Sequence, residues 1–264
     1  MLKKVRILVL ALCAVLLFAC QSMEQATLTI VQYNVGVFGK YAESGVDAIA
    51  SAVKEMGADV VTLNELDSCT TRTGNVYQLA EFAQAMGGWN CHYASAMPYR
   101  GGAYGVGVAS KPELEIISSG KISLPKLDGY EPRAVAVVEY EDFIICSTHL
   151  DLTQGAQLGQ VETINAYFES HYSDCRKPIF LGGDFNCLPD SKPLALLKQS
   201  WTLLTPESVS FPSHAPDRCI DYIFVRPNGR EISVEAASTP QLLQNADLAT
   251  ASDHLPVVLA VTIK

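Results

Sequence analysis

Apolar residues alternate with polar ones, or run together, in a series of stretches that have the length of β-strands. These stretches are rich in valine, isoleucine and aromatic residues, which favour strands. They cover residues 27–34, 59–66, 104–110, 133–140, 142–150, 177–185, 219–225 and 254–263. Between some of them apolar residues recur at helical spacing, first at Val46, Ile49, Ala50 and Val53 and later at Leu158, Val161 and Phe168. The pattern predicts an α/β protein.

The predicted strands differ in which of their faces are apolar. Residues 178–182, PIFLG, are apolar on both faces, which implies a sheet covered on each side, whereas alternating stretches suggest antiparallel pairing. No internal repeat, low-complexity tract or linker interrupts residues 27–264. The chain has 264 residues, 48% of them hydrophobic, and can therefore bury a large core. We expect one domain over residues 27–264.

The first twenty residues have a different composition from the rest. Three basic residues, Lys3, Lys4 and Arg6, precede an unbroken apolar run over residues 7–19. This run is too short to span a bilayer as a stable helix, and its basic flank indicates an export signal. We therefore predict a signal peptide over residues 1–20.

The end of this leader, LFAC, resembles a lipobox, in which Cys20 would be lipidated and become the mature N-terminus. Ser22 fits sorting to the outer membrane. We expect a cell-envelope lipoprotein of the outer membrane, joined to its lipid anchor by a short tether over residues 21–26. Simple secretion is the alternative.

Loss of the leader makes the chain more acidic. The chain has 19 Lys and Arg and 28 Asp and Glu residues, and the leader holds three of the basic ones and no acidic one, so 16 and 28 remain, a formal charge of -12. Such a surface repels polyphosphate backbones unless a local patch or metal ions reverse the field. Bulk nucleic acid is therefore a poor first candidate partner. Six cysteines remain beyond Cys20 in a compartment that permits disulfides, and their pairing stays open.

Polar residues that can perform chemistry gather where the predicted strands stop. They are Asn34, Glu65, His149, Asp184, Asn186, Asp221, Asp253 and His254. Each alone has an ordinary explanation as a turn residue, a solvated charge or a structural histidine. Their repeated placement at strand ends indicates a common site.

The stretch LGGDFN, residues 181–186, suggests what this site does. In an extended segment residues i and i+2 face the same side, so Asp184 and Asn186 should present an acceptor and an amide donor to one point. Water that attacks a phosphorus centre needs a base to take its proton and a donor to meet the growing negative charge. Gly182 and Gly183 fit either a close backbone approach or a plain turn.

The ordered series QYN, LNE, STHLD, GGDFN, RCIDYIF and SDHLPV, between residues 32 and 257, resembles the endonuclease/exonuclease/phosphatase superfamily. These metal-dependent phosphoesterases are similar to DNase I, sphingomyelinases and inositol-polyphosphate 5-phosphatases. The resemblance implies that residues 27–264 form the catalytic domain. It also implies a four-layer α-β-β-α sandwich of two mixed β-sheets packed face to face, with helices outside.

The resemblance further implies a metal site and a water-activating base. Carboxylate and amide oxygens suit Mg²⁺ or Mn²⁺, and Glu65 with Asn34 supplies them from neighbouring strand ends. The family places a third ligand at Asp253, immediately before its last histidine. Asp184 would activate the water, and Asn186 would support the transition state.

The two histidines would contact the phosphate from opposite sides. Consecutive strand residues face opposite ways, so Asp253 is badly placed to orient His254 and Asp221 is the better candidate. A histidine held by a buried carboxylate can stay protonated and contact the phosphate, or protonate the leaving oxygen. His149 would contact the phosphate from the other side.

Two arginines, Arg72 in RTG and Arg133 in EPR, could clamp a phosphate, and they could equally be structural ion-pair partners. We expect an exported, monomeric phosphoesterase that acts on a phosphodiester or phosphomonoester such as a lipid headgroup, an inositol phosphate or a sugar phosphate. Its partners would be this substrate and, through the lipid anchor, a membrane. An extracytoplasmic nuclease is the first alternative, and a non-catalytic binding lipoprotein on the same scaffold is the second.

Overall fold

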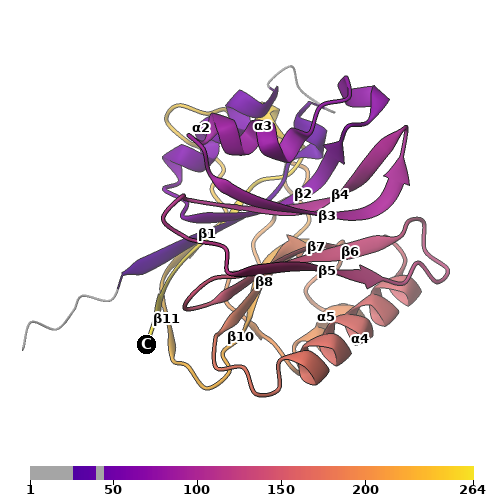
Figure 1. The fold of residues 1–264 in the computed structure, drawn as a ribbon, viewed down its shortest axis with the longest axis vertical. Helices are drawn as coiled ribbons and strands as arrows, with labels where there is room; N and C mark the ends of the chain where they lie inside the picture. Colours follow the sequence, from indigo (N-terminus) through magenta and orange to yellow (C-terminus); the bar gives the residue numbers. More distant parts are fainter. Residues whose placement is uncertain (1–25, 40–44) are drawn as a thin grey trace, which may run out of the picture.

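Residues 26–39 and 45–264 are described by a computed structural model. The predicted leader with its lipidation site Cys20 and residues 21–25 of the predicted tether lie outside the described residues. Two β-sheets of six strands each face one another across the middle of the molecule, and helices cover their outer faces (Figure 1). Within the described segments, no helix combines the length and the apolar character needed to cross a membrane.

The first sheet has the strand order β11-β12-β1-β2-β4-β3. Its strands are β1 (Thr27–Asn34), β2 (Val60–Ser68), β3 (Asn90–Tyr99), β4 (Gly102–Ser110), β11 (Ile232–Ser238) and β12 (Val257–Ile263). The central pair, β1 and β2, is parallel, and the other pairs are antiparallel.

The second sheet has the order β5-β6-β7-β8-β10-β9. Its strands are β5 (Ser118–Leu124), β6 (Arg133–Glu139), β7 (Ile144–His149), β8 (Ile179–Asp184), β9 (Thr202–Leu203) and β10 (Asp221–Arg226). Its central pair, β7 and β8, is again the parallel one. Both sheets are therefore mixed, as expected, and each places the carboxyl ends of two neighbouring strands at one edge.

Helices connect these parallel strands. In the first sheet α2 (Gly45–Glu55) links β1 to β2, and in the second α4 (Gln154–His171) links β7 to β8. The remaining helices of the described segments are short: η1 (Gly36–Phe38), η2 (Thr71–Thr73), α3 (Gln78–Ala85), α5 (Lys192–Leu197) and α6 (Leu248–Ala251).

Three hydrophobic layers hold the four structural layers together. Between the sheets, Ile30 of β1 and Phe180 of β8 belong to one buried cluster. The first sheet packs against α2 and α3 through a cluster that includes Ile49, and the second packs against α4 and α5 through a cluster that includes Phe168 and Leu194. Burial of such a side chain stabilises the fold by about 2 kcal/mol. The α-β-β-α order confirms the expected fold class (Figure 1).

The six cysteines of the described domain are free thiols. Cys146 and Cys187 are buried, and burial raises the pKa of both thiols. They behave as small apolar core residues.

Candidate active site

The ends of the two parallel strand pairs meet over one cavity of about 470 Å³. Predicted site residues that line it are Glu65, Arg133, His149, Asp184, Asn186, Asp253 and His254. Asn34 and Asp221 lie buried behind them, where Asn34 Nδ2 donates to Asp184 Oδ2 at 3.0 Å and Asp221 Oδ2 lies 2.9 Å from His254 Nδ1. The structure thus brings together nine of the predicted residues, which come from segments far apart in the sequence.

Glu65 reaches this cavity because strand β2 is irregular at that point. We expected Glu65 near the end of a strand, but β2 continues to Ser68 and its pairing with β4 shifts register between Leu63 and Leu66. Leu63 and Leu66 both pack in the outer core, so Glu65 is an extra residue between them, with φ at 57°. Non-glycine residues rarely adopt this left-handed conformation. With regular alternation the Glu65 side chain would be buried under the helices. The bulge turns it toward the cavity instead.

The expected extended geometry of Asp184 and Asn186 is wrong. Strand β8 ends at Asp184, and Asn186 has a φ of 50°. Its backbone N–H donates to Asp184 Oδ1 at 2.9 Å, and its side-chain Nδ2 donates to the Leu150 carbonyl at 3.0 Å. Both residues still line the cavity because a left-handed turn, which asparagine tolerates well, replaces the extended step.

Gly182 lies inside β8 where this strand faces β2 of the other sheet. A β-carbon at this position would come within 2.4 Å of the Thr62 hydroxyl oxygen on β2. The glycine therefore serves a close approach and not a turn, which decides between the two expectations from the sequence.

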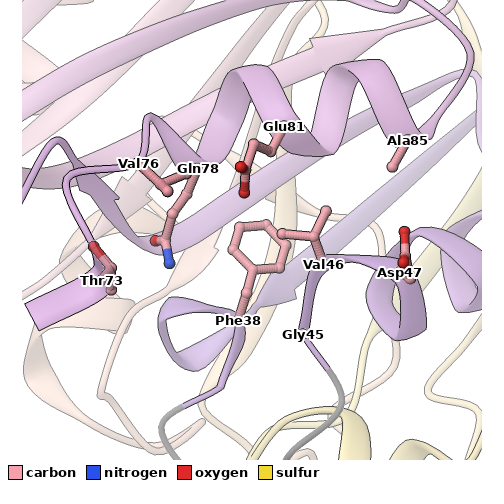
Figure 2. A pocket seen from close by; sticks show the side chains of 9 residues that line it. All are labelled: Phe38, Gly45, Val46, Asp47, Thr73, Val76, Gln78, Glu81 and Ala85. Carbon is pink, nitrogen blue, oxygen red and sulfur yellow. The ribbon is translucent and has the colours of Figure 1, made fainter.

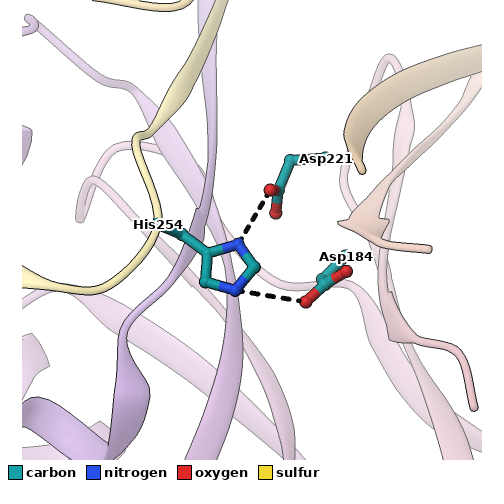
Figure 3. Close-up of side chains that lie close together, drawn as sticks. All are labelled: Asp184, Asp221 and His254. Atoms are coloured by element: carbon teal, nitrogen blue, oxygen red, sulfur yellow. Dashed lines mark hydrogen bonds and ion pairs between the residues drawn. The ribbon is translucent and has the colours of Figure 1, made fainter. Parts of the chain in front are cut away.

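A buried triad of Asp184, His254 and Asp221 forms the floor of the site (Figure 3). His254 Nδ1 donates to Asp221 Oδ2 at 2.9 Å, and its Nε2 lies 3.6 Å from Asp184 Oδ2. Burial alone would lower the pKa of His254, but the carboxylates of Asp221 and Asp184 raise it. Burial and the charge of Asp221 raise the pKa of Asp184 above its usual range. The triad therefore favours a protonated imidazole beside a carboxyl group of increased basicity.

Two buried amides that the sequence analysis did not single out brace this triad. Asn64 Oδ1 accepts from the Asp184 backbone N–H at 2.9 Å and from Gln32 Nε2 at 2.6 Å, while Asn64 Nδ2 donates to the Thr148 carbonyl at 2.7 Å. Gln32 Nε2 also lies 3.3 Å from Asp221 Oδ1. These bonds join strands of the first sheet to strands of the second beneath the cavity. The available sequence signal was the presence of two polar residues, Gln32 and Asn64, at inward-facing positions of strands that are otherwise largely apolar.

His149 and Arg133 form the opposite wall. Arg133 Nη1 lies 3.3 Å from His149 Nδ1 and 3.3 Å from Glu131 Oε2. Because a guanidinium can only donate, His149 Nδ1 accepts and its proton sits on Nε2, which lies 3.5 Å from Asp184 Oδ2. Arg133 is 5% exposed, and its Nε makes no hydrogen bond to the described part of the protein. This wall can meet an anion in the cavity with N–H donors.

Arg72 lies outside this cavity. Its Nε and Nη2 donate to the two carboxylate oxygens of Asp67 at 2.7 and 2.8 Å, and its guanidinium lies 4.5 Å from the centre of the Tyr99 ring. Burial raises the pKa of Asp67, but hydrogen bonds from Arg72, Thr70 and Thr73 outweigh it and hold the pKa below its usual range. Arg72 is therefore held in an ion pair with Asp67, and it also lines a small adjoining pocket of about 100 Å³ with Glu65 and Glu131, so both of its expected roles stay open.

Two sets of side chains could hold a metal ion. Asp184, Asp221 and His254 place one ligand atom each within 4.8 Å of one another. The oxygens of Asp221 are already occupied, since Oδ2 accepts from Ser210 Oγ at 2.6 Å and from His254, and Oδ1 faces Gln32. An ion there would have to displace these bonds, so we interpret this set as a hydrogen-bonded catalytic group.

The other set is the predicted one, Glu65, Asn34 and Asp253. Both carboxylates line the cavity, and Asn34 Nδ2 lies 3.4 Å from Glu65 Oε1. Asn34 Oδ1 accepts one hydrogen bond, from the Gly36 backbone N–H at 3.1 Å, and an amide oxygen has a second lone pair. Because Asn34 turns its Nδ2 toward Glu65 and Asp184, the two carboxylates are the hard oxygen donors that face the cavity and fit a divalent cation such as Mg²⁺ or Mn²⁺, and Asn34 would join them through the second lone pair of Oδ1.

A second hollow of about 450 Å³ lies between η1, α2 and α3 (Figure 2). It is lined by two carboxylates, Asp47 and Glu81, together with Phe38, Val46 and Gln78 among others. Its described lining includes no histidine, cysteine or basic side chain. Among the described residues, this hollow therefore lacks the imidazole and guanidinium groups that line the first cavity.

The Endonuclease/Exonuclease/phosphatase family model matches residues 31–254, which is most of the chain. No curated protein matches this chain. Among solved structures, an endonuclease/exonuclease/phosphatase family protein of Bacteroides thetaiotaomicron is 16% identical and covers 91% of this chain and 99% of its own, with a TM-score of 0.74. A mannosyl-6-phosphatase of the same organism is 17% identical, with coverage of 89% and 99% and a TM-score of 0.73. The human Nocturnin catalytic domain with a bound sulfate anion is 14% identical, with coverage of 90% and 95% and a TM-score of 0.67. At these identities the structural likeness establishes the fold.

Proposed function

Because the chain belongs to the endonuclease/exonuclease/phosphatase family, we propose that it is a divalent-metal-dependent phosphoesterase that hydrolyses a phosphodiester or phosphomonoester with water. One observation carries this proposal. A basic carboxyl group, Asp184, and two imidazoles, His149 and His254, surround one cavity whose mouth holds further carboxylates. This is the set of groups that activates water, neutralises a phosphoryl group and protonates a leaving oxygen.

Asp184 is the general base in this scheme. A base works best when its pKa lies near the operating pH, and burial together with Asp221 moves the pKa of Asp184 in that direction. The Asn34 amide and the Asn186 backbone N–H, which both donate to Asp184, fix the carboxylate in one orientation.

His254 is the charged donor to the phosphoryl group or the leaving oxygen. Its Nδ1–H is held by Asp221, so its Nε2–H is directed to the side on which Asp184 lies. His149 Nε2–H and the Arg133 guanidinium would meet the phosphoryl oxygens from the other wall, and Asn186 would support the transition state.

Glu65, Asn34 and Asp253 would hold the cation. When bound, Mg²⁺ or Mn²⁺ would neutralise the phosphoryl charge and polarise the ester. The acidic character of the chain, with a formal charge of -9, makes such an ion more important, because the protein surface alone repels an anionic substrate.

We also propose that the enzyme is exported and lipid-anchored through Cys20, because a basic flank and an apolar run precede a lipobox-like LFAC. The structurally similar mannosyl-6-phosphatase makes sugar phosphates worth testing beside lipid and inositol phosphates. The net negative charge disfavours bulk nucleic acid as the substrate.

The test is a substrate panel with the purified full-length chain and either Mg²⁺ or Mn²⁺. It includes p-nitrophenyl phosphate, bis(p-nitrophenyl) phosphate, mannose 6-phosphate, inositol phosphates, phospholipids and plasmid DNA. Asp184→Ala should abolish hydrolysis, whereas Asp190→Ala, at an exposed carboxylate in the following loop, should not. Inactivity toward every ester with both ions would refute the proposal, and turnover of DNA alone would replace it with the nuclease alternative.

A further inference from the structure

Exposed apolar side chains gather beside the catalytic cavity. Leu127, Tyr130, Leu152 and Leu188 are 61, 68, 58 and 49% exposed. They come from three separate loops, between β5 and β6, between β7 and α4, and between β8 and α5. A single exposed apolar residue is ordinary, but a group from several segments around a functional opening indicates a binding surface.

The three loops are fixed to one another at the start of α4. Tyr130 donates its backbone N–H to Asp151 Oδ2 at 2.8 Å. Because Asp151 directly precedes Leu152, this bond joins the loop of Tyr130 to the loop of Leu152. Gln157 Nε2 bonds the carbonyl oxygens of Asp151 at 2.7 Å and Asn186 at 3.0 Å, which ties in the loop that carries Leu188.

The side chain of Leu127 lies against α4 as well. A β-carbon on Gly159 would come within 2.4 Å of Leu127 Cδ1. The four side chains, which we call the apolar rim, therefore lie on loops that these hydrogen bonds and the packing of Leu127 hold around the first turns of α4.

The apolar rim is continuous with the catalytic cavity. Tyr130 and Leu152 line the cavity, and together with Arg218 they are its exposed lining residues, whereas the catalytic side chains are buried or half-buried. An ester whose phosphoryl group reaches His149 and His254 can therefore extend its organic portion past Tyr130 and Leu152.

We propose that the apolar rim binds a hydrocarbon chain of the substrate, so that this enzyme prefers amphiphilic phosphate esters over small polar ones. This inference rests on the proposed phosphoesterase function and names its substrate class. A sugar or inositol phosphate would leave these side chains in water, whereas an alkyl or acyl chain would cover them. The hydrocarbon chain of the substrate is the proposed occupant because the apolar rim is continuous with the cavity.

The size of the effect follows from the area that each methylene covers. A fully buried methylene strengthens binding about fourfold, and on an open rim, where about half of its surface is covered, we expect about twofold. Four additional methylenes should then raise kcat/KM by roughly sixteenfold.

The experiment compares butyl phosphate with octyl phosphate, and the corresponding p-nitrophenyl alkyl diesters, at concentrations below micelle formation. The full-length protein is used with Mg²⁺ or Mn²⁺, and p-nitrophenyl phosphate and bis(p-nitrophenyl) phosphate report hydrolysis that needs no chain. In wild type the octyl ester should exceed the butyl ester by about sixteenfold in kcat/KM. A ratio near one, with the p-nitrophenyl esters hydrolysed, would overturn this inference alone, and absence of all hydrolysis would overturn the proposed function with it.

Variants then locate the effect. Tyr130→Ser/Leu152→Ser should reduce the octyl-to-butyl ratio to near one. The matched control Ile117→Ser/Leu242→Ser removes two side chains that are 57 and 88% exposed and do not line the cavity, and it should keep the wild-type ratio. An unchanged ratio in the first variant, or an equal loss in both, would contradict the assignment. If the first variant does not fold, the wild-type chain-length series still decides.

Discussion

Replacement of Asp221 by asparagine tests how the buried triad works. Asp221 Oδ2 accepts from His254 Nδ1 at 2.9 Å and from Ser210 Oγ at 2.6 Å, and Oδ1 lies 3.3 Å from Gln32 Nε2. An asparagine side chain has nearly the same shape and keeps one oxygen that can accept a hydrogen bond, but it removes the negative charge beside His254. The substitution therefore changes the electrostatics of the triad more than its packing.

The expected loss can be worked from the charges. Two unit charges about 4 Å apart interact by about 4 kcal/mol at an effective dielectric constant of about 20. The carboxylate of Asp221 makes the largest contribution among the charges that raise the pKa of His254. Its removal therefore takes away much of the stabilisation of the imidazolium. Because roughly 1.4 kcal/mol corresponds to a factor of ten in rate, we expect kcat to fall by about 1000-fold, with a smaller change in KM.

The assay is steady-state hydrolysis of p-nitrophenyl phosphate or bis(p-nitrophenyl) phosphate with Mg²⁺, with circular dichroism to establish that the variant is folded. Asp217→Asn is the matched control, because Asp217 is exposed in the preceding loop and lies outside the triad. A folded Asp221→Asn protein that loses less than about tenfold in kcat would refute the idea that Asp221 maintains the charge of His254.

Three further substitutions test other parts of the structure. Asn64→Ala leaves the Asp184 backbone N–H and the Thr148 carbonyl without their buried partner, and should lower the free energy of unfolding by about 3 kcal/mol in urea titrations; a loss below about 1 kcal/mol would contradict the bracing role. Arg72→Ala should lower the free energy of unfolding by about 2 kcal/mol at pH 7. Since the pKa of Asp67 is depressed in the folded protein, this difference from wild type should shrink as the pH falls below about 4. A difference that does not change with pH would disprove the ion pair. Glu65→Gln should raise the Mn²⁺ concentration that gives half-maximal activity by at least about tenfold, whereas Glu81→Gln in the second hollow should not, and equal responses would exclude Glu65 as a ligand.

The strands that the sequence predicted and those that it missed differ in their place in the sheets. Every predicted strand is present within a few residues, and these strands carry a continuous or alternating apolar signal because they are buried. The missed strands, β3, β5, β9 and β11, are the edge strands of the two sheets. An edge strand buries few side chains, as the largely exposed pattern of β11 illustrates, so its sequence carries little hydrophobic periodicity.

In the candidate site, the sequence predicted which residues take part, but it did not predict the backbone conformation that positions them. The residues around the cavity could be predicted because carboxylates, amides and imidazoles at strand ends are chemically distinctive. The bulge at Glu65 and the left-handed turn at Asn186 could not, because each depends on pairing with a distant strand or loop. The ion pair between Arg72 and Asp67 could not be predicted either, because it depends on where the buried Asp67 lies in the fold.

The direction of β1 has a practical consequence for how the enzyme can be held. Thr27 pairs with Thr262, so both ends of the described domain emerge together, while Asn34 at the other end of β1 lies behind the catalytic cavity. Eight residues of strand separate the two by about 25 Å. Immobilisation through a tag at the C-terminus, which follows Thr262, would therefore leave the opening at the far end of β1, facing the bulk solution. A protein coupled in this way should remain as accessible to dissolved esters as the free enzyme.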